Sequence, residues 1–241
     1  MDEGRSVHIS VCGFSDVGPK RADNQDVIMA NGAIGVGSHS WISLEGDLDG
    51  AFSAAVVDGM GGYVGGADAA AIAAAFLGSR HLPDNAEDAN SLFERLDVGI
   101  SAAGAAWATP KMGATAAMLT LRAGSAFFAN VGDCRIYRVV DGGVQVMTVD
   151  DRFRNSNHIV TQSLGQVRRL NAHFRKEPLG AGRTRFALCS DGTWGTLKDC
   201  VMNEFLTSDE SLHDLLASMR SALFEHRAND NVSVLLIDVD A

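Results

Sequence analysis

Short apolar stretches of β type occur in consecutive runs along this 241-residue chain, and helical patterns occur in two pairs between them. The stretches either alternate apolar and polar residues or are wholly apolar, as half-buried and buried strands are. Grouped strands favour an antiparallel sheet with helices packed on it, whereas regular strand–helix alternation favours a parallel sheet. We therefore expect an α+β fold. The expected strands span residues 6–14, 51–57, 114–121, 126–131, 134–140, 144–149, 185–190 and 232–239.

The helical patterns predict two helix pairs. In the first pair an alanine-rich segment, 67–79, is followed by 91–107 after a connection at 84–90. The second pair spans 194–206 and 211–225, where leucine and methionine recur at the spacing of one helix face. The helices thus have apolar faces with which to cover a sheet.

Composition and charge limit the class of protein. Apolar residues make up 46% of the chain, enough for a large core, so we expect one domain over residues 1–241. A formal net charge of -10 argues against a general affinity for nucleic acid or anionic lipid, because both are polyanions. The four cysteines show no C-x-x-C spacing, and no apolar run reaches the roughly 18 residues of a membrane span. We expect a cytoplasmic protein with reduced thiols and no membrane partner, and we favour a monomer.

Aspartates at the ends of expected strands are the most informative polar residues. An Asp-Gly pair usually marks a tight turn, and that explains Asp49 and Asp141. Asp58 and Asp191 differ, because each ends an apolar run and is followed by glycine and then a helical segment. Three further aspartates also border an expected strand or apolar run, which gives a set of five: Asp26, Asp58, Asp133, Asp191 and Asp230.

Convergence of these five carboxylates would require cations. Two like charges about 4 Å apart repel by about 4 kcal/mol at an effective dielectric constant near 20. Oxygen ligands without histidine or cysteine favour Mg²⁺, Mn²⁺ or Ca²⁺ over Zn²⁺. The alternative that the residues leave open is five separate turn or cap residues.

Six motifs follow one another along the chain: GPKRADNQD at 18–26, VVDGMGG at 56–62, GATAA at 113–117, VGDCRIYR at 131–138, LCSDGTW at 188–194 and NDNVSVLL at 229–236. In this order and approximate spacing they resemble the motif series of the type 2C, or PPM, family of metal-dependent protein serine/threonine phosphatases. The resemblance implies a four-layer αββα sandwich of two mostly antiparallel sheets flanked by helix pairs.

The resemblance also implies a binuclear Mn²⁺ or Mg²⁺ centre. Asp58 would bridge the two ions, and the carbonyl of Gly59 would add a ligand to one of them. Asp191 and Asp230 would complete the coordination of the second ion. Two such cations lower the pKa of a bridging water and neutralise charge on phosphoryl oxygens, so the reaction needs no covalent nucleophile.

Three further roles follow from the same resemblance. Asp26 would act through metal-held water, and Asp133 would bind a possible third metal together with Asp191. Arg21 would clamp the substrate phosphate, since a guanidinium fork matches phosphate geometry. The residues expected to carry catalysis are therefore Arg21, Asp26 and Asp58. The expected partner is a phosphoprotein substrate in a circuit with a serine/threonine kinase.

The chain departs from the family pattern in two places. Gly195 stands where relatives commonly carry an acid, which should weaken affinity for one ion. After Val149 there is little room for the mobile flap of relatives, so we expect a more open cleft. Two alternatives stay open: a non-catalytic pseudophosphatase that binds phosphoproteins, and a metal-dependent hydrolase of small phosphoesters. Residues 152–185 also hold eight basic groups and one acid, either as a solvated face or as a docking surface for an acidic partner.

Overall fold

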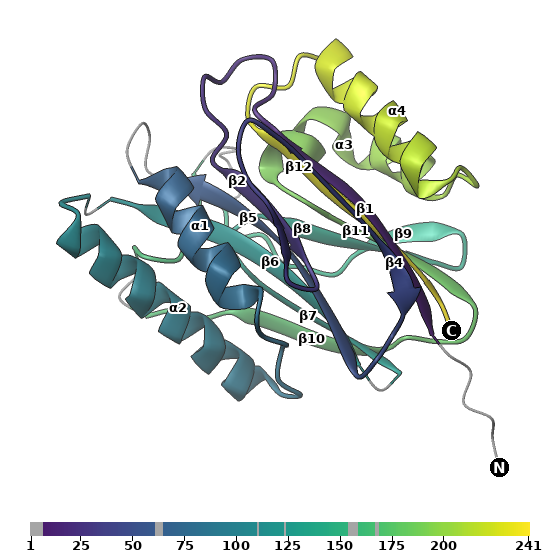
Figure 1. Ribbon diagram of the computed structural model, residues 1–241, viewed down its shortest axis with the longest axis horizontal. Coiled ribbons are helices and arrows are strands. Elements are labelled where there is room, and N and C mark those ends of the chain that lie inside the picture. Colours follow the sequence, from purple (N-terminus) through teal and green to yellow (C-terminus); the bar gives the residue numbers. More distant parts are fainter. Residues whose placement is uncertain (1–6, 61–64, 110, 123, 154–158, 167–168) are drawn as a thin grey trace.

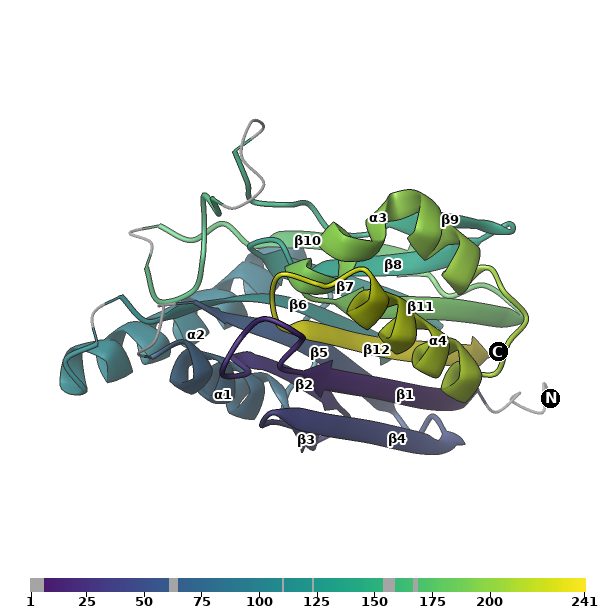
Figure 2. The same ribbon diagram turned by 90° about the horizontal axis from the view of Figure 1, so that it is seen from above.

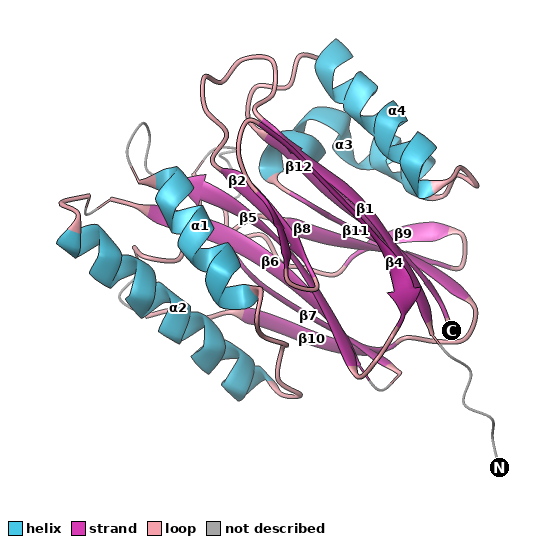
Figure 3. Cartoon of the chain, in the orientation of Figure 1, coloured by secondary structure: helices cyan, strands magenta, loops and turns pink. Residues whose placement is uncertain are grey.

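The computed structural model describes residues 7–60, 65–109, 111–122, 124–153, 159–166 and 169–241. Two six-stranded sheets lie face to face, and each carries a pair of helices on its outer side (Figures 1 and 3). Figure 2 shows the same layers from above, with α3 and α4 on one side and α1 and α2 on the other. The expected four-layer αββα sandwich is confirmed.

Every strand pair in the two sheets is antiparallel. The first sheet has the order β4-β1-β12-β11-β8-β9 and the second the order β10-β7-β6-β5-β2-β3. The first sheet consists of β1 (His8–Asp16), β4 (His39–Asp47), β8 (Arg135–Val140), β9 (Gly143–Val146), β11 (Arg183–Cys189) and β12 (Val232–Asp240). The second consists of β2 (Asp26–Ala30), β3 (Ala33–Gly35), β5 (Ala51–Met60), β6 (Gly113–Arg122), β7 (Ser125–Val131) and β10 (His173–Pro178).

Three apolar layers hold the sandwich together. One lies between the two sheets, and one lies under each helix pair. The pair α1 (Gly66–Leu77) and α2 (Ala86–Ala106) covers the second sheet, and α3 (Asp191–Leu206) and α4 (Leu212–Glu225) cover the first. Central strands are therefore buried on both faces, which explains why β5, β6 and β12 are nearly continuous apolar runs. Among the described residues, no helix combines the length and the apolarity needed to cross a bilayer.

Strand and helix positions agree with the sequence-based expectations except at polar edges and at β2, a buried five-residue strand that was not expected. Residues 31–50, where no strand was expected, contain β3 and the nine-residue edge strand β4. The charged strand β10 was not expected, because edge strands carry polar residues that hide the strand pattern. Helix α2 begins at Ala86 rather than at residue 91, because the Asn85 side chain accepts a hydrogen bond from the backbone of Asp88 at 2.9 Å and caps the helix.

The connection between β9 and β10, residues 147–172, lies beside one end of the sandwich. Its described part includes a bridge between Arg152 and Val160, and the flanks of 154–158 extend away from the sheets in Figure 2. The expectation of a shortened flap concerns this connection, whose tip at 154–158 lies outside the described residues. That expectation stays a prediction.

Helix α3 is interrupted at Lys198. The backbone there has φ 58° and ψ 163°, a region that is essentially occupied only by glycine, and the helix kinks at this point. A lysine in this conformation stores strain of order 1–3 kcal/mol.

We predict that Lys198→Gly raises the free energy of unfolding by about 1 kcal/mol, because glycine adopts this conformation without strain. Ala217→Gly, at an exposed regular position of α4, is the matched control and should lower the free energy by about 1 kcal/mol. Urea denaturation of both variants measures the difference. A loss of stability at both positions would contradict the assigned strain.

Candidate metal centre

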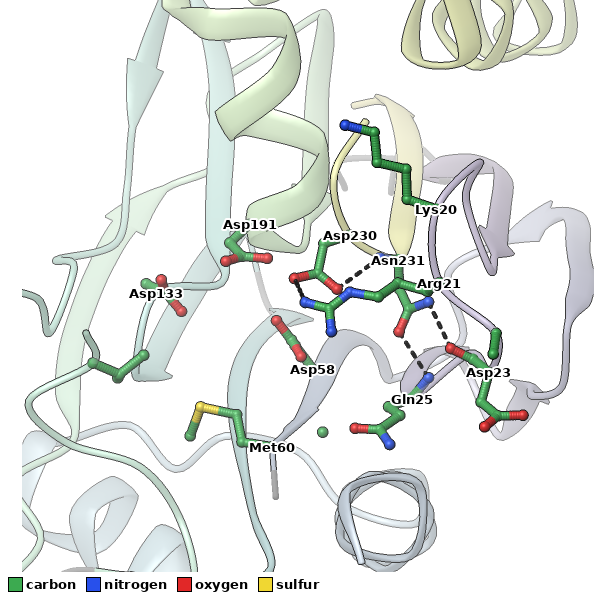
Figure 4. Close-up of a pocket in the computed structure, with 13 residues that line it drawn as sticks. Lys20, Arg21, Asp23, Gln25, Asp58, Met60, Asp133, Asp191, Asp230 and Asn231 are labelled. Atoms are coloured by element: carbon green, nitrogen blue, oxygen red, sulfur yellow. Dashed lines mark hydrogen bonds and ion pairs between the residues drawn. The ribbon is translucent and has the colours of Figure 1, made fainter. Parts of the chain in front are cut away.

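A cavity of about 480 Å³ opens at the end of the sandwich where β5 stops and α3 begins. Four of the five predicted aspartates line it and point into a common space in Figure 4: Asp58, Asp133, Asp191 and Asp230. They come from strand β5, from the turn after β7, from the first residue of α3 and from the turn before β12. Residues far apart in the sequence thus meet because the ends of both sheets lie together here.

Asp58 and Asp191 form the centre of this group. Their side chains are in hydrogen-bond contact, which two ionised carboxylates could not maintain. Burial raises the pKa of Asp58 well above its ordinary value, and the negative charges of Asp26 and Asp191 raise it further. Burial and the charge of Asp230 likewise raise the pKa of Asp191. Ionisation of both carboxyls is therefore unfavourable unless a positive charge lies beside them.

Asp133 closes one side of the cavity. The residue is 3% exposed, and its backbone carbonyl accepts a hydrogen bond from the indole Nε1 of Trp194 at 3.0 Å. Burial, followed by the charge of Asp191, raises the pKa of Asp133 to about 7, while Arg152 opposes the shift. Trp194 in the LCSDGTW motif therefore fixes the turn that carries this acid.

Asp230 closes the other side and is paired with Arg21. The guanidinium Nη2 of Arg21 lies 2.5 Å from Asp230 Oδ2, and the backbone N–H of Asn231 donates to Asp230 Oδ1 at 2.9 Å. Arg21 is half-exposed at the rim of the cavity. A positive, forked group therefore reaches the acids from the solvent side (Figure 4).

Asp26 occupies a different place from the other four. It lies directly opposite Asp58 in the β2–β5 ladder, but its carboxylate does not line the cavity. Instead Ser190 Oγ and Ser233 Oγ donate to the same oxygen, Asp26 Oδ2, at 2.6 and 2.7 Å. Burial raises the pKa of Asp26 from its ordinary value of 3.8 to about 7, although these two hydrogen bonds lower it. Asp26 thus joins the two sheets behind Asp58.

The two unusual Asp-Gly pairs owe their glycines to crowding rather than to turns. A Cβ at Gly59 would lie 2.1 Å from the carbonyl oxygen of Gly66, and one at Gly192 would lie 2.0 Å from the carbonyl oxygen of Asn231. By contrast, Gly50 and Gly142 have positive φ and open space around them, as turn glycines do. The distinction drawn between these pairs from the sequence is confirmed.

Two further site residues were not singled out from the sequence. The buried Asn231 accepts from the backbone N–H of Gln25 at 3.0 Å and donates to the carbonyls of Val17 and Asp23, both at 2.9 Å. It therefore fixes the loop that presents Arg21. Gln25 lines the cavity, whereas the expected Asp26 does not. The sequence offered one signal for both residues: each is polar and stands next to a predicted ligand, Asn231 next to Asp230 and Gln25 next to Asp26.

The donors in the cavity fit a hard divalent cation. They are carboxylates, and their mutual repulsion would be relieved by positive charge. Within the described ranges, no three acidic, histidine or cysteine side chains already enclose an ion as they stand. Binding of an ion would therefore require the carboxylates to turn toward it.

Comparison with known proteins finds a family and individual proteins that this chain resembles. The profile of the family described as protein phosphatase 2C matches residues 41–236. The serine/threonine protein phosphatase PstP of Mycobacterium tuberculosis is 28% identical over 249 residues, covering 93% of this chain and 44% of PstP. The chain thus spans less than half the length of the curated relatives it matches.

Solved structures share the fold. The catalytic domain of PstP in complex with two manganese ions has a TM-score of 0.80 at 21% identity, covering 98% of this chain and 100% of that one. The serine/threonine phosphatase of S. agalactiae has a TM-score of 0.76 at 21% identity, covering 95% and 98% of the two chains. PppA of Pseudomonas aeruginosa also reaches 0.76 at 21% identity, covering 95% and 96%.

We predict that Asp26→Asn stabilises the metal-free protein at pH 8 by about 1–3 kcal/mol, since each unit of a raised pKa corresponds to about 1.4 kcal/mol. The folded protein holds the Asp26 proton up to about pH 7, whereas the unfolded chain releases it near 3.8, so the aspartate loses stability as pH rises through that window. The oxygen of asparagine keeps both serine hydrogen bonds.

Urea denaturation in EDTA at pH 5 and pH 8 measures this prediction. The advantage of Asp26→Asn should shrink markedly at pH 5, where the wild-type carboxyl is protonated. An advantage that is equal at both pH values would contradict the assignment of the shift to Asp26.

Proposed function

This chain belongs to the protein phosphatase 2C family, and on that premise we propose that it hydrolyses phosphoserine and phosphothreonine in proteins. The observation that carries the proposal is the meeting of four carboxylates around one cavity with Arg21 at its rim. Carboxylates in this arrangement suit divalent cations, and a guanidinium beside them suits a phosphate. The proposed site lies within residues 1–241, which we take as one domain.

We propose that Asp58, Asp191 and Asp230, with the carbonyl of Gly59, hold two Mn²⁺ or Mg²⁺ ions. Asp133 together with Asp191 would hold a third. The PstP catalytic domain contains two manganese ions, which supports this choice of metal. Divalent cations bound there would supply Lewis acidity toward water and toward the phosphoryl oxygens.

The protein's own groups bind and orient the substrate. In this proposal Arg21 leaves Asp230 Oδ2 and donates its fork to two phosphate oxygens, and Asn231 fixes the loop that carries it. Asp26 is not placed to touch the substrate, because Ser190 and Ser233 hold it behind Asp58. We infer that Asp26 positions Asp58 across the strand pair.

The proposed partner is a phosphoprotein in a circuit with a serine/threonine kinase, acting in the cytoplasm. The name of PstP as a serine/threonine protein phosphatase supports a phosphoprotein substrate. Retention of all five acids and of Arg21 favours catalysis over a pseudophosphatase that only binds.

We predict that a phosphothreonine peptide is hydrolysed with Mn²⁺ or Mg²⁺ and not in EDTA, and that Asp191→Asn lowers kcat by at least about 100-fold. Asp49→Asn is the matched control, because Asp49 also precedes a glycine but lies in an exposed turn. Turnover of p-nitrophenyl phosphate alone would favour the small-ester hydrolase. A folded protein without turnover of either substrate would favour the pseudophosphatase.

We also predict a metal response that does not depend on turnover. At a hundredfold excess over the dissociation constant, a bound ion stabilises the fold by about 2.7 kcal/mol, which raises Tm by roughly 5–10 °C for a chain of this size. Thermal unfolding with and without Mn²⁺ measures the shift. The shift should be smaller in Asp191→Asn and unchanged in Asp49→Asn; equal shifts in all three proteins would contradict the assigned ligands.

A further inference from the structure

A second cavity, of about 490 Å³, adjoins the first on the side of helix α3. The two cavities share a wall formed by Arg21, Asp191 and Asp230. Beyond that wall the second cavity is lined by Arg135, Arg152, Trp194, Lys198 and their neighbours. A ligand whose phosphate reaches the first cavity can therefore extend directly into the second.

The charge of the lining differs between the two cavities. Five acidic and two basic residues line the first, whereas three acidic and four basic residues line the second. Two of the three acids in the second cavity, Asp191 and Asp230, belong to the shared wall. The acid that belongs to the second cavity alone is Asp199, and it already pairs with Arg135 at 3.2 Å. The unshared part of the second cavity is therefore basic.

Trp194 forms the floor on which two of the cations are held. The guanidinium carbons of Arg135 and Arg152 lie 3.9 and 4.3 Å from the centroid of its ring. Both arginines also pair with Asp150 at 2.7 Å, which fixes their orientation. Stacking and pairing together hold the two cations against the cavity before any ligand binds.

Two of the cations keep unused donors. The Nε of Arg152 is buried and has no hydrogen-bond partner, an uncommon state for a buried N–H group. Lys198 is exposed on the cavity wall, and within the described ranges its ammonium has no hydrogen-bond or ion-pair partner. Lys198 is also the residue with the strained backbone in α3, and strain of this kind concentrates at binding sites.

The second cavity has free space beside these cations, at Gly195. Gly195 lines the second cavity, and a Cβ at this position would meet no heavy atom within 4 Å. Space for a ligand side chain is therefore present next to the cations.

We propose that the second cavity binds an anionic side chain of the substrate, on a residue near the one whose phosphate enters the first cavity. This inference rests on the proposed phosphatase function. The ligand chemistry is a carboxylate or a second phosphate, held by Lys198 and Arg152 over the indole of Trp194. The cavity thus selects phosphoproteins with an acidic or multiply phosphorylated sequence around the target residue.

The test compares three phosphothreonine peptides of equal length. Their flanking residues on both sides are glutamine, glutamate or phosphoserine. We expect kcat/KM to be about fivefold higher for the glutamate peptide than for the glutamine peptide, as one moderately exposed charge pair would give. Lys198→Glu should abolish this ratio, and Arg95→Glu, an exposed reversal on α2, should leave it unchanged. Tighter binding of the phosphoserine peptide than of the glutamate peptide in EDTA, where neither is hydrolysed, would identify a second phosphate as the ligand; equal binding would show that the cavity accepts either anion.

A binding measurement separates failure of the subsite from failure of the phosphatase assignment. Fluorescence anisotropy gives the affinities of labelled glutamate and glutamine peptides in EDTA, where turnover is not required. Tighter binding of the glutamate peptide that Lys198→Glu removes supports the subsite, even if no peptide is hydrolysed. Equal affinities, together with equal kcat/KM values where turnover occurs, would overturn it while leaving the phosphatase proposal intact.

Discussion

Mutual repulsion among partly and fully buried carboxylates is the constraint on which the rest of this structure depends. Asp26 and Asp58 face each other across two strands, and Asp191 contacts Asp58 from the start of a helix. The pKa values of all three are raised, first by burial and then by neighbouring charge. A protein can contain such a cluster of buried carboxyls only if the apolar layers around the cluster stabilise the fold without it. The three layers of this sandwich do so, and the repulsion that remains at the cavity favours a bound cation.

Most of the architecture could be predicted from the sequence, because the central strands are wholly apolar and the helices have clear apolar faces. Two of the errors lie where polar residues begin a helix or form an edge strand. The start of α2 was hidden by the polar first turn that Asn85 caps, and β10 was hidden by its charged residues. Both errors share one cause: local polarity indicates exposure, and exposure alone does not distinguish a loop from an edge strand or a first helical turn.

The site was predictable as a set of residues, but the direction in which each side chain points was not. Motif order brought Asp58, Asp133, Asp191 and Asp230 together correctly. Asp26 points to Ser190 and Ser233, because hydrogen-bond donors from the opposite sheet lie there, and sequence spacing does not reveal such partners. The basic residues of 152–185 also lie in different surroundings in the structure. Arg185 is buried against Asp238 and Arg175 pairs with Glu177, whereas Arg152 reaches a cavity.

The place of β12 in the sheet has a consequence for synthesis on the ribosome. This strand pairs with β1, more than two hundred positions earlier, and the turn before it supplies Asp230 and Asn231. A nascent chain that has not yet released residues 230–240 lacks one acid of the cavity, the tether of the Arg21 loop and the inner neighbour of β1. Contacts of such long separation also form slowly. The cavity is therefore complete only after the turn before β12 and the strand itself have been synthesised and have paired with β1.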